Sequence, residues 1–265
     1  MRYVFNDLEN IKINLADKYL YLFLDYDGTL TPIAGTPDKA IIPQRTKRLL
    51  DLLSKKKNCR IAVISGRALA DIKKRIGLKN VIYSGNHGFQ IDGPKIKHGL
   101  PVSPAYKKAL LRIKTQLKEK LSGTKGIFIE DKGFSLALHF RLVDKGELSF
   151  VKTIFRKSIV PYLIRNKIKI RPGKKVLEVM PPVDWDKGKV VLWLLTRQIL
   201  AFKKKNIFPV YIGDDVTDED AFRALKGKGL TIFVGKPGNS KADYYLKNAE
   251  EVVKFMRLIG DLKLN

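Results

Sequence analysis

A six-residue apolar run from Tyr19 to Leu24 ends abruptly in the acidic turn Asp25–Thr29, which places Asp25 and Asp27 two residues apart. The run has no polar alternation, so it predicts a strand that is buried on both faces, as in a parallel sheet. Open parallel sheets bind ligands at the carboxyl edge of their strands. The two carboxylates are therefore expected at the edge where a site would form.

Strands and helices alternate on both sides of a different central region. After the first strand, the pattern predicts a helix from Pro43, a buried strand at 60–64, a helix ending at Gly77 and a strand at 81–83. The same pattern returns after Pro182, with a helix from near Lys187, strands at 210–212 and 230–234, and a last helix at 250–259. This alternation predicts a doubly wound, parallel-sheet (Rossmann-like) α/β core.

The central region follows another pattern. Ser103 and Pro104 predict the start of a helix that runs through Leu121. Apolar and polar residues then alternate over 134–141, which is typical of an antiparallel strand with one buried face. A helix at 147–165 and strands at 168–170 and 174–179 follow. We therefore predict that residues 1–99 plus 181–265 form the α/β core, and that residues 100–180 form an inserted α+β cap domain.

Composition excludes several classes of protein. The longest apolar runs of this 265-residue chain have six residues, whereas a membrane-spanning helix needs about 20. The N-terminus lacks the apolar stretch of a secretory signal, and the single cysteine, Cys59, cannot form an internal disulfide. We expect a cytoplasmic protein.

The chain is strongly basic, with 52 basic and 26 acidic residues and a formal net charge of +26. This excess fits nucleic-acid binding, attraction of acidic small substrates, or a lysine-rich solvated surface. Residues 100–180 hold 19 bases and 6 acids, so half of the net charge lies in the predicted insert. No aromatic residues interleave the lysine runs, as a base-stacking surface would require.

Against this basic background, five acids crowd into residues 214–220, directly after the predicted strand at 210–212. Like charges this close repel each other, so a bound cation is a natural counterweight. A helix N-terminus explains Glu219 and Asp220, but it does not explain Asp214 at the end of the strand. We therefore favour a metal site that includes Asp214.

The remaining polar residues fit a phosphate group. Ser65 ends the second strand and offers a hydroxyl and backbone N–H groups, and Lys187 supplies positive charge. The chain has no Walker A or G-x-G-x-x-G sequence, and Thr36 replaces the glutamate that an EF-hand loop starting at Asp25 would need. A nucleophilic Asp, a neighbouring Asp, a Ser, a Lys and an acidic metal site together describe phosphoryl transfer through an aspartyl-phosphate.

Four parts of the chain resemble the motifs of the haloacid-dehalogenase-like phosphatases: residues 24–30, Ser65, Lys187 and residues 213–218. Further segments are similar to patterns of the trehalose-6-phosphate phosphatase family; they are Gly85–Gly88, Glu130–Gly133, His139–Arg141, Leu177–Val179 and Gly213–Phe222. The resemblance covers residues 20–258. It implies Mg²⁺-dependent hydrolysis of trehalose 6-phosphate to trehalose and phosphate, the last step of trehalose biosynthesis.

The resemblance also implies roles for single residues. Asp25 would be the nucleophile and a magnesium ligand. Asp27 would bind magnesium through its backbone oxygen, while its side chain acts as general acid and base. Asp214 would be the remaining protein ligand to the metal. Ser65 and Lys187 would hold the phosphate oxygens.

Other residues are expected to support or bind the substrate. Asp215 and Asp218 would lie behind the ligands, with Asp218 orienting Lys187 or a water of the metal site. The resemblance implies substrate contacts from Arg67, Asn86, His87, Glu130, Lys132, Arg141, Lys174 and Glu178. Lys174 and Glu178 lie four apart on a predicted strand, hence on one face. The positive charge of the insert would then serve a cationic lid over a dianionic substrate.

Two other interpretations stay open. A phosphatase of the same fold could act on another sugar phosphate, such as sucrose phosphate or mannosyl-3-phosphoglycerate. A basic nucleic-acid-binding protein with an inactive α/β domain would bind nucleic acid in a salt-sensitive way, but the intact acidic cluster argues against it. We expect a small-molecule partner, no membrane partner and a monomer. Two positions depart from the family pattern, Phe140 where tyrosine is common and Gln90 where an acid is common.

Overall fold

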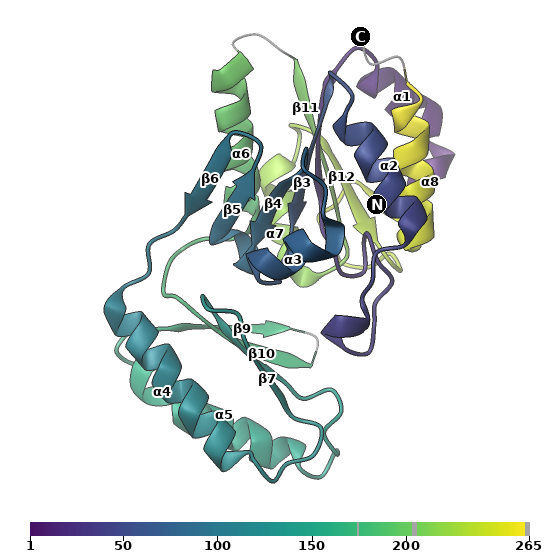
Figure 1. Ribbon diagram of the computed structural model, residues 1–265. Helices are drawn as coiled ribbons and strands as arrows, with labels where there is room; N and C mark the ends of the chain where they lie inside the picture. Colours follow the sequence, from purple (N-terminus) through teal and green to yellow (C-terminus); the bar gives the residue numbers. More distant parts are fainter. Residues whose placement is uncertain (174, 203–205, 263–265) are drawn as a thin grey trace. The chain divides into compact units, whose positions relative to one another are not determined.

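The computed structural model describes residues 1–173, 175–202 and 206–262. The chain divides into two compact units, one formed by residues 1–99 and 185–265 and the other by residues 100–184 (Figure 1). The second unit is therefore one continuous stretch inserted into the first. It ends at Asp184 rather than at Met180.

The first unit is built on a nine-stranded sheet with the strand order β1-β13-β12-β11-β2-β3-β4-β5-β6. In this order across the sheet, every pair of neighbours from β1 through β13, β12, β11, β2 and β3 to β4 is parallel. The pairs β4–β5 and β5–β6 are antiparallel. The bounds are Arg2–Tyr3 (β1), Tyr19–Leu24 (β2), Cys59–Ile64 (β3), Ile82–Gly85 (β4), Gln90–Gly93 (β5), Ile96–Gly99 (β6), Ile207–Gly213 (β11), Leu230–Val234 (β12) and Tyr244–Leu246 (β13).

The strand order reverses at the centre of this sheet. From β2 the chain continues to β3 and β4 on one side, whereas β11, β12 and β13 lie on the other side. β2 pairs with β11 from Tyr19 to Leu24 and with β3 from Leu20 to Leu24. The connections that leave β2 and β11 therefore diverge, and this is the point where such sheets bind their ligands.

Alternate side chains of β2 enter two hydrophobic cores on opposite faces of the sheet. Leu20, Leu22 and Leu24 join the core formed with α1, α2, α3 and α8, whereas Tyr21 and Phe23 join the core formed with α6 and α7. All six residues of β2 are buried, as the unbroken apolar run predicts. The helices span Leu8–Leu15 (α1), Gln44–Ser54 (α2), Leu69–Ile76 (α3), Lys187–Phe202 (α6), Glu219–Leu225 (α7) and Ala249–Gly260 (α8).

The inserted unit pairs two helices with a four-stranded antiparallel sheet of order β7-β8-β10-β9. Ser103 caps the first helix by accepting a hydrogen bond from the Tyr106 N–H at 3.1 Å, with Pro104 in the first turn. Leu136 and Leu138 of the sheet pack into the core under the helices. The bounds are Pro104–Lys120 (α4), Phe128–Asp131 (β7), Leu136–His139 (β8), Leu148–Leu163 (α5), Lys169–Gly173 (β9) and Val176–Met180 (β10).

The predicted fold class, an α/β core with a parallel sheet and an inserted α+β cap, is confirmed. Several short elements escaped the sequence analysis: α1, the hairpin of β5 and β6, and the edge strands β1 and β13. The last predicted strand of the insert begins at Val176 rather than at position 174, and Lys174 lies outside the described residues. Strands of two to four residues are too short to show a period.

Exposed bases crowd the outer sides of the two helices of the insert. They are Lys107, Lys108, Arg112, Lys118 and Lys120 on α4 and Lys152, Arg156 and Lys157 on α5. These helices cover one face of the four-stranded sheet, and a large part of the positive charge of the insert therefore lies on the helical side. Within the part of the chain that the structure describes, no helix combines the length and apolar character needed to cross a membrane.

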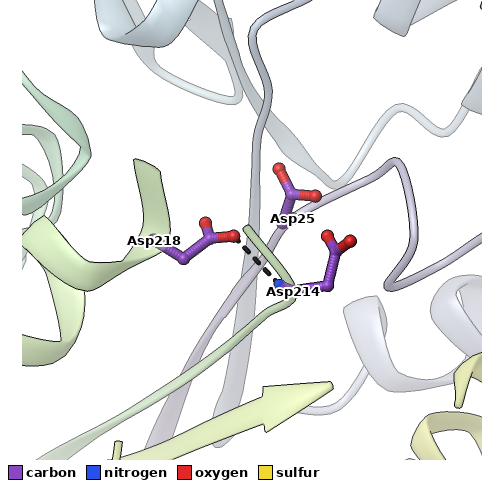
Figure 2. A group of neighbouring side chains, drawn as sticks. All are labelled: Asp25, Asp214 and Asp218. Atoms are coloured by element: carbon purple, nitrogen blue, oxygen red, sulfur yellow. Dashed lines mark hydrogen bonds between the residues drawn. The ribbon is translucent and has the colours of Figure 1, made fainter. Parts of the chain in front are cut away.

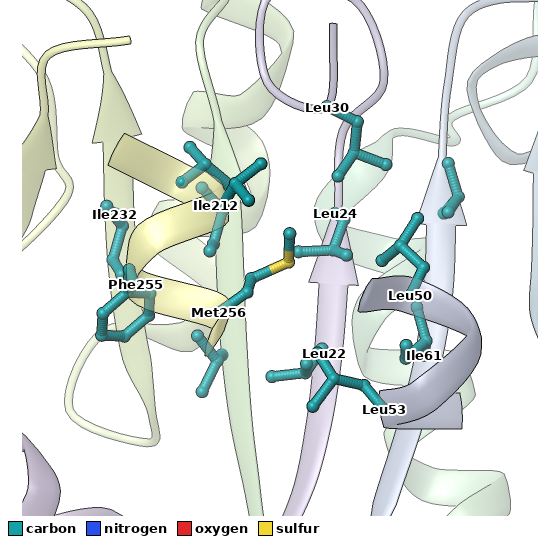
Figure 3. Close-up of a cluster of buried hydrophobic side chains, with 14 of the residues drawn as sticks. Leu22, Leu24, Leu30, Leu50, Leu53, Ile61, Ile212, Ile232, Phe255 and Met256 are labelled. Atoms are coloured by element: carbon teal, nitrogen blue, oxygen red, sulfur yellow. The ribbon is translucent and has the colours of Figure 1, made fainter. Parts of the chain in front are cut away.

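Helix α2 provides a test of the core because it carries a buried and an exposed leucine two residues apart. Leu50 is fully buried in the core cluster that also contains Leu22 and Leu24 (Figure 3), whereas Leu52 is 63% exposed. We expect Leu50→Ala to lower the free energy of unfolding by about 2–5 kcal/mol. The control Leu52→Ala should change it by less than about 0.5 kcal/mol. Urea unfolding measures both, and equal effects would contradict the packing described.

Candidate active site

Four of the predicted site residues follow neighbouring strands of the core sheet. Asp25 comes directly after β2, Ser65 after β3, Asn86 after β4 and Asp214 after β11. All four therefore lie at the carboxyl edge of the parallel strands. Lys187 reaches the same edge as the first residue of α6.

Lys187 is the buried cation of this edge. Its ammonium group donates to Asp25 Oδ1 at 2.6 Å and to Asp218 Oδ1 at 2.7 Å. Its side chain is 3% exposed, and those of Asp25 and Asp218 are 7% and 0% exposed. The predicted link between Asp218 and Lys187 is thus present, and Lys187 also holds Asp25.

Asp218 receives four hydrogen bonds. Its Oδ1 accepts from Lys187 and from the hydroxyl of buried Tyr211, the latter at 2.6 Å. Its Oδ2 accepts from the backbone N–H of Asp214 at 3.0 Å (Figure 2) and from that of Asp215 at 2.9 Å. Both oxygens are committed, so Asp218 fits an anchoring role better than that of a metal ligand. Tyr211 was missed because its position in an apolar strand indicated only core.

Asp25, Asp214 and Asp218 form an acidic group in which one oxygen of each lies within 4.8 Å of the others (Figure 2). Asp214 Oδ1 is buried, and no group of the described residues donates a hydrogen bond to it. Gly28 closes over this side chain with φ at +83°, and a Cβ there would lie 2.1 Å from Asp214 Oδ2. An unpartnered buried carboxylate oxygen beside a second carboxylate fits a hard divalent cation such as Mg²⁺.

The pKa values reflect the shortage of positive charge. Burial raises the pKa of Asp25 to about 7, although the charge of Lys187 acts in the opposite direction. Burial and the charge of Asp25 raise the pKa of Asp214 to about 9. Burial alone lowers the pKa of Lys187, but the charges of Asp218 and Asp25 raise it well above its usual range. One ammonium group thus faces three buried or half-buried carboxylates.

The carboxylate of Asp27 points to another partner. Arg67 donates to both of its oxygens, from Nε at 2.8 Å and from Nη2 at 2.6 Å. The third Arg67 nitrogen, Nη1, donates to Asp71 at 2.9 Å. Arg67 was expected to contact substrate, but these bonds engage its guanidinium group with two carboxylates of the core. Asp71 was not among the predicted residues.

Backbone hydrogen bonds link the turn after β3 to the turn after β4. The Ser65 carbonyl accepts the N–H of His87 at 3.0 Å, and the Ser65 hydroxyl accepts the N–H of Arg67 at 3.1 Å. α3 begins at Leu69, so Ser65 precedes its first turn rather than opening it. Asn86 and His87 adopt left-handed conformations, with φ of 51° and 55°. Such backbone strain is typical of positions with a functional constraint.

Asn86 and Asp215 have local partners as well. The side-chain amide of Asn86 donates to Gln90 at 2.9 Å, and both Asn86 and His87 are buried. Gln90, which departs from the family pattern, thus accepts a hydrogen bond within the turn. Asp215 is exposed and caps the short turn Val216–Asp218, accepting the N–H of Val216 at 2.7 Å.

The inserted unit holds a second polar group on its sheet. Glu178 Oε1 accepts from Lys132 at 3.0 Å and from the Ser135 hydroxyl at 2.5 Å. Glu130 pairs with His139 at 2.9 Å. Glu130 and Glu178 both lie opposite Ala137 in the sheet register, hence on one face. Ser135 was noted in the alternating segment but was not predicted as a site residue.

Arg141 and Lys174 complete the predicted substrate contacts of the insert. Arg141 is exposed in the turn after β8, beyond the last strand residue His139. Lys174 is outside the described residues. The structure therefore groups three predicted residues of the insert, Glu130, Lys132 and Glu178, together with His139, which was not predicted as a site residue.

Comparisons with known proteins cover most of the chain, including both units. The model of the family described as trehalose-phosphatase matches residues 23–249. The probable trehalose-phosphate phosphatase 3 of Oryza sativa subsp. japonica is 34% identical over 276 residues, covering 97% of this chain and 74% of its own length. The probable trehalose-phosphate phosphatase I of Arabidopsis thaliana is 36% identical over 261 residues, covering 93% of this chain and 69% of its own length.

A solved structure supports the same assignment. The C-terminal domain of the C. albicans trehalose-6-phosphate phosphatase aligns with a TM-score of 0.82 at 26% identity, covering 98% of each chain. The resemblance inferred from the motifs is confirmed. The chain belongs to the trehalose-phosphatase family, a family of phosphoric monoester hydrolases.

Proposed function

We propose that this protein is a Mg²⁺-dependent trehalose-6-phosphate phosphatase that works through an aspartyl-phosphate on Asp25. The observation that carries the proposal is the buried Asp25 carboxylate at the strand-order reversal, bonded to Lys187 at 2.6 Å. The carboxylates of Asp214 and Asp218 lie beside it. A nucleophile, a cation and a divalent-metal site in one place are the parts that phosphoryl transfer to a carboxylate requires.

In the first step, an oxygen of Asp25 attacks phosphorus and the bond from phosphorus to the sugar oxygen breaks. The side chain of Asp27 donates a proton to the departing sugar oxygen. Lys187 and Ser65 stabilise the oxygens of the transferring phosphoryl group. In the second step, water attacks phosphorus and gives its proton to Asp27. The bond from phosphorus to Asp25 then breaks, which releases phosphate and restores the enzyme.

The magnesium ion would be held by the carboxylates of Asp25 and Asp214 and by the backbone oxygen of Asp27. When bound, it supplies positive charge that reduces the repulsion between the attacking carboxylate and the phosphate. Asp218 remains the anchor of Lys187, because its oxygens already accept four hydrogen bonds. Asp215 keeps its position through the cap that it forms on the following turn.

Sugar recognition is assigned to the polar face of the inserted sheet, with Glu130, Lys132 and Glu178 as the central contacts. These groups are pre-oriented by the pairs that they form with one another, with Ser135 and with His139. Arg141 and Lys174 stay predicted contacts of the same unit, and Asn86 and His87 stay predicted contacts of the core. Arg67 also stays a predicted contact of the core, and three of its five N–H groups donate to Asp27 and Asp71.

Cytoplasmic location and a monomeric state stay predictions from the sequence. The structure adds that Cys59 is free and buried.

Phosphate release tests the reaction, the nucleophile and the substrate together. We expect trehalose 6-phosphate to be hydrolysed faster than glucose 6-phosphate, sucrose 6-phosphate or mannosyl-3-phosphoglycerate. Chelation of divalent ions should abolish the activity, and Asp25→Asn should lower it by more than about a thousandfold, because the attacking group is lost.

Each alternative has its own result in that assay. Metal-dependent activity that favours another sugar phosphate would keep the mechanism and reject the sugar assignment. No release from any substrate, together with salt-sensitive binding of nucleic acid, would favour the nucleic-acid-binding interpretation.

Lys187→Met tests the charge balance in the metal-free protein. It leaves Asp25 and Asp218 buried without their cation, so the free energy of unfolding at pH 7 should fall by about 3–5 kcal/mol. The folded-state pKa of Asp25, about 7 with Lys187 present, should rise further without that cation. An acid with a raised folded-state pKa loses stability as the pH rises from its unfolded to its folded pKa, and for Asp25 in wild type this loss is complete near pH 7. In the variant the loss continues above pH 7, so the deficit should grow as the pH rises from about 7 to about 9.

Urea unfolding across that pH range, with EDTA present, measures the effect. The control is Lys55→Met, which removes an exposed i,i+4 pair with Asp51 and should cost no more than about 1 kcal/mol. A deficit for Lys187→Met that stays constant with pH would contradict the assignment.

Glu178→Gln tests the sugar assignment. We expect the KM for trehalose 6-phosphate to rise about tenfold, because a charged hydrogen-bonding group is lost from the sugar face. Hydrolysis of 4-nitrophenyl phosphate, which has no sugar, should be nearly unchanged. Glu119→Gln on α4 is the control, because Glu119 is exposed in the same unit. An equal loss on both substrates would indicate damage to the unit rather than a lost sugar contact.

A further inference from the structure

Asp27 is held by a chain of ion pairs that leads away from the acidic group. Arg67 donates to both oxygens of Asp27, and its remaining terminal nitrogen donates to Asp71 Oδ2 at 2.9 Å. We propose that Asp71 is a positioning residue for leaving-group protonation, acting through Arg67 on the carboxylate of Asp27. This inference rests on the acid role of Asp27 proposed above.

Arg67 is suited to link Asp71 to Asp27, because its side chain is buried and bonds to both carboxylates. Its side chain is 8% exposed, whereas that of Asp27 is 47% exposed. Its guanidinium carbon lies 5.2 Å from the centre of the Tyr26 ring. The guanidinium group thus lies over the ring of Tyr26 while it bonds to the next residue of the turn, Asp27. A planar fork with two parallel bonds fixes the plane of the carboxylate as well as its distance.

Asp71 is fixed in turn by Arg75. Arg75 Nε lies 2.9 Å from each carboxylate oxygen of Asp71. Arg75 Nη1 donates to the carbonyls of Asp38 and Ala40, at 3.3 and 3.1 Å. The Tyr26 hydroxyl donates to the same Ala40 carbonyl at 3.0 Å. The contacts therefore form a closed circuit. It runs from the turn after β2, which contains Tyr26 and Asp27, through Arg67 and α3 to residues 38–40, and returns to Tyr26 through the Ala40 carbonyl.

The circuit needs an ionised Asp71. Burial acts to raise the pKa of Asp71, but hydrogen bonds from Arg75 and Arg67 lower it below its usual range. Asp71 therefore stays charged at neutral pH and holds both arginines. Without this charge, Arg67 loses one of its two anchors and the carboxylate of Asp27 gains freedom to rotate.

The geometry leaves Asp27 able to work while it is held. A carboxylate has about four lone-pair sites on its two oxygens, and Arg67 occupies one on each oxygen. The others remain for a proton and for the leaving oxygen. Fixing the plane of the carboxylate therefore also fixes the direction of the remaining lone-pair sites. When these sites are misaligned, proton transfer to the leaving oxygen is slower even if the distance is right.

The leaving group distinguishes this role from a structural one. A sugar alkoxide needs a proton as it departs, whereas 4-nitrophenolate leaves as a stable anion without one. The ratio kcat/KM reports phosphoryl transfer to Asp25 and excludes the later hydrolysis of the phosphoenzyme. A defect in aiming Asp27 should therefore lower kcat/KM for the sugar phosphate and spare the nitrophenyl ester.

The experiment compares Asp71→Asn and Asp71→Ala with wild type on trehalose 6-phosphate and 4-nitrophenyl phosphate. We expect Asp71→Ala to lower kcat/KM for the sugar phosphate about tenfold, as is typical for residues that orient a reacting group through another. Asp71→Asn should have a smaller effect of the same kind. Both variants should stay within about twofold of wild type on the nitrophenyl ester.

Asp51→Asn is the matched control, because Asp51 forms an i,i+4 pair with Lys55 on α2 of the same unit. It should match wild type on both substrates. Thermal unfolding of every variant confirms that the protein assayed is folded. Equal losses on the two substrates, or no loss on either, would overturn the role of Asp71.

Asp27→Asn separates the inference from the proposed function. If Asp27→Asn is selective for the sugar phosphate and Asp71→Ala is not, the positioning role fails and the acid role of Asp27 stands. If Asp27→Asn is not selective, the acid role itself fails, and the role of Asp71 falls with it.

Discussion

The ammonium group of Lys187 lies between two carboxylates that come from distant parts of the core sequence. Asp25 precedes Lys187 by 162 residues, and Asp218 follows it by 31 residues. Each of these charges would be costly to bury alone, so each depends on the others for its position. The first turn of α6, the end of β2 and the turn after β11 are joined at this point. One cation cannot balance several ionised carboxylates, so the pKa values of Asp25 and Asp214 are raised, and a divalent ion is the counterpart that would keep them ionised.

The elements that sequence analysis predicted correctly are those whose environment is uniform along the chain. β2 is buried on both faces, so its unbroken apolar run identified it and located Asp25. β12 was predicted with its observed bounds for the same reason. The acidic cluster was recognised because five acids are conspicuous in a chain with a net charge of +26. The helix cap at Ser103 was visible because capping depends on adjacent residues.

What escaped prediction depends on contacts between distant residues. The pairing of Arg67 with Asp27, 40 residues earlier, was not predicted, because it follows only from the packing of β2 against β3. Tyr211 resembles any core tyrosine until the fold places its hydroxyl at Asp218. Ser135 meets Glu178 across 43 residues through the register of two antiparallel strands. Side-chain partners of this kind are set by tertiary structure, which local periodicity does not encode.

The insertion of residues 100–184 into the core also dictates an order of events during synthesis. β2 and its neighbour β3 leave the ribosome early, but the other neighbour of β2, β11, follows only after the whole insert. One edge of a strand that is buried on both faces must therefore wait, unpaired, while the intervening residues are made. Pairing over such long separations is intrinsically slow, and an open apolar edge invites association with other chains. The edge that holds the candidate active site needs β2 and β11 together, so it can form only after the whole insert has been made.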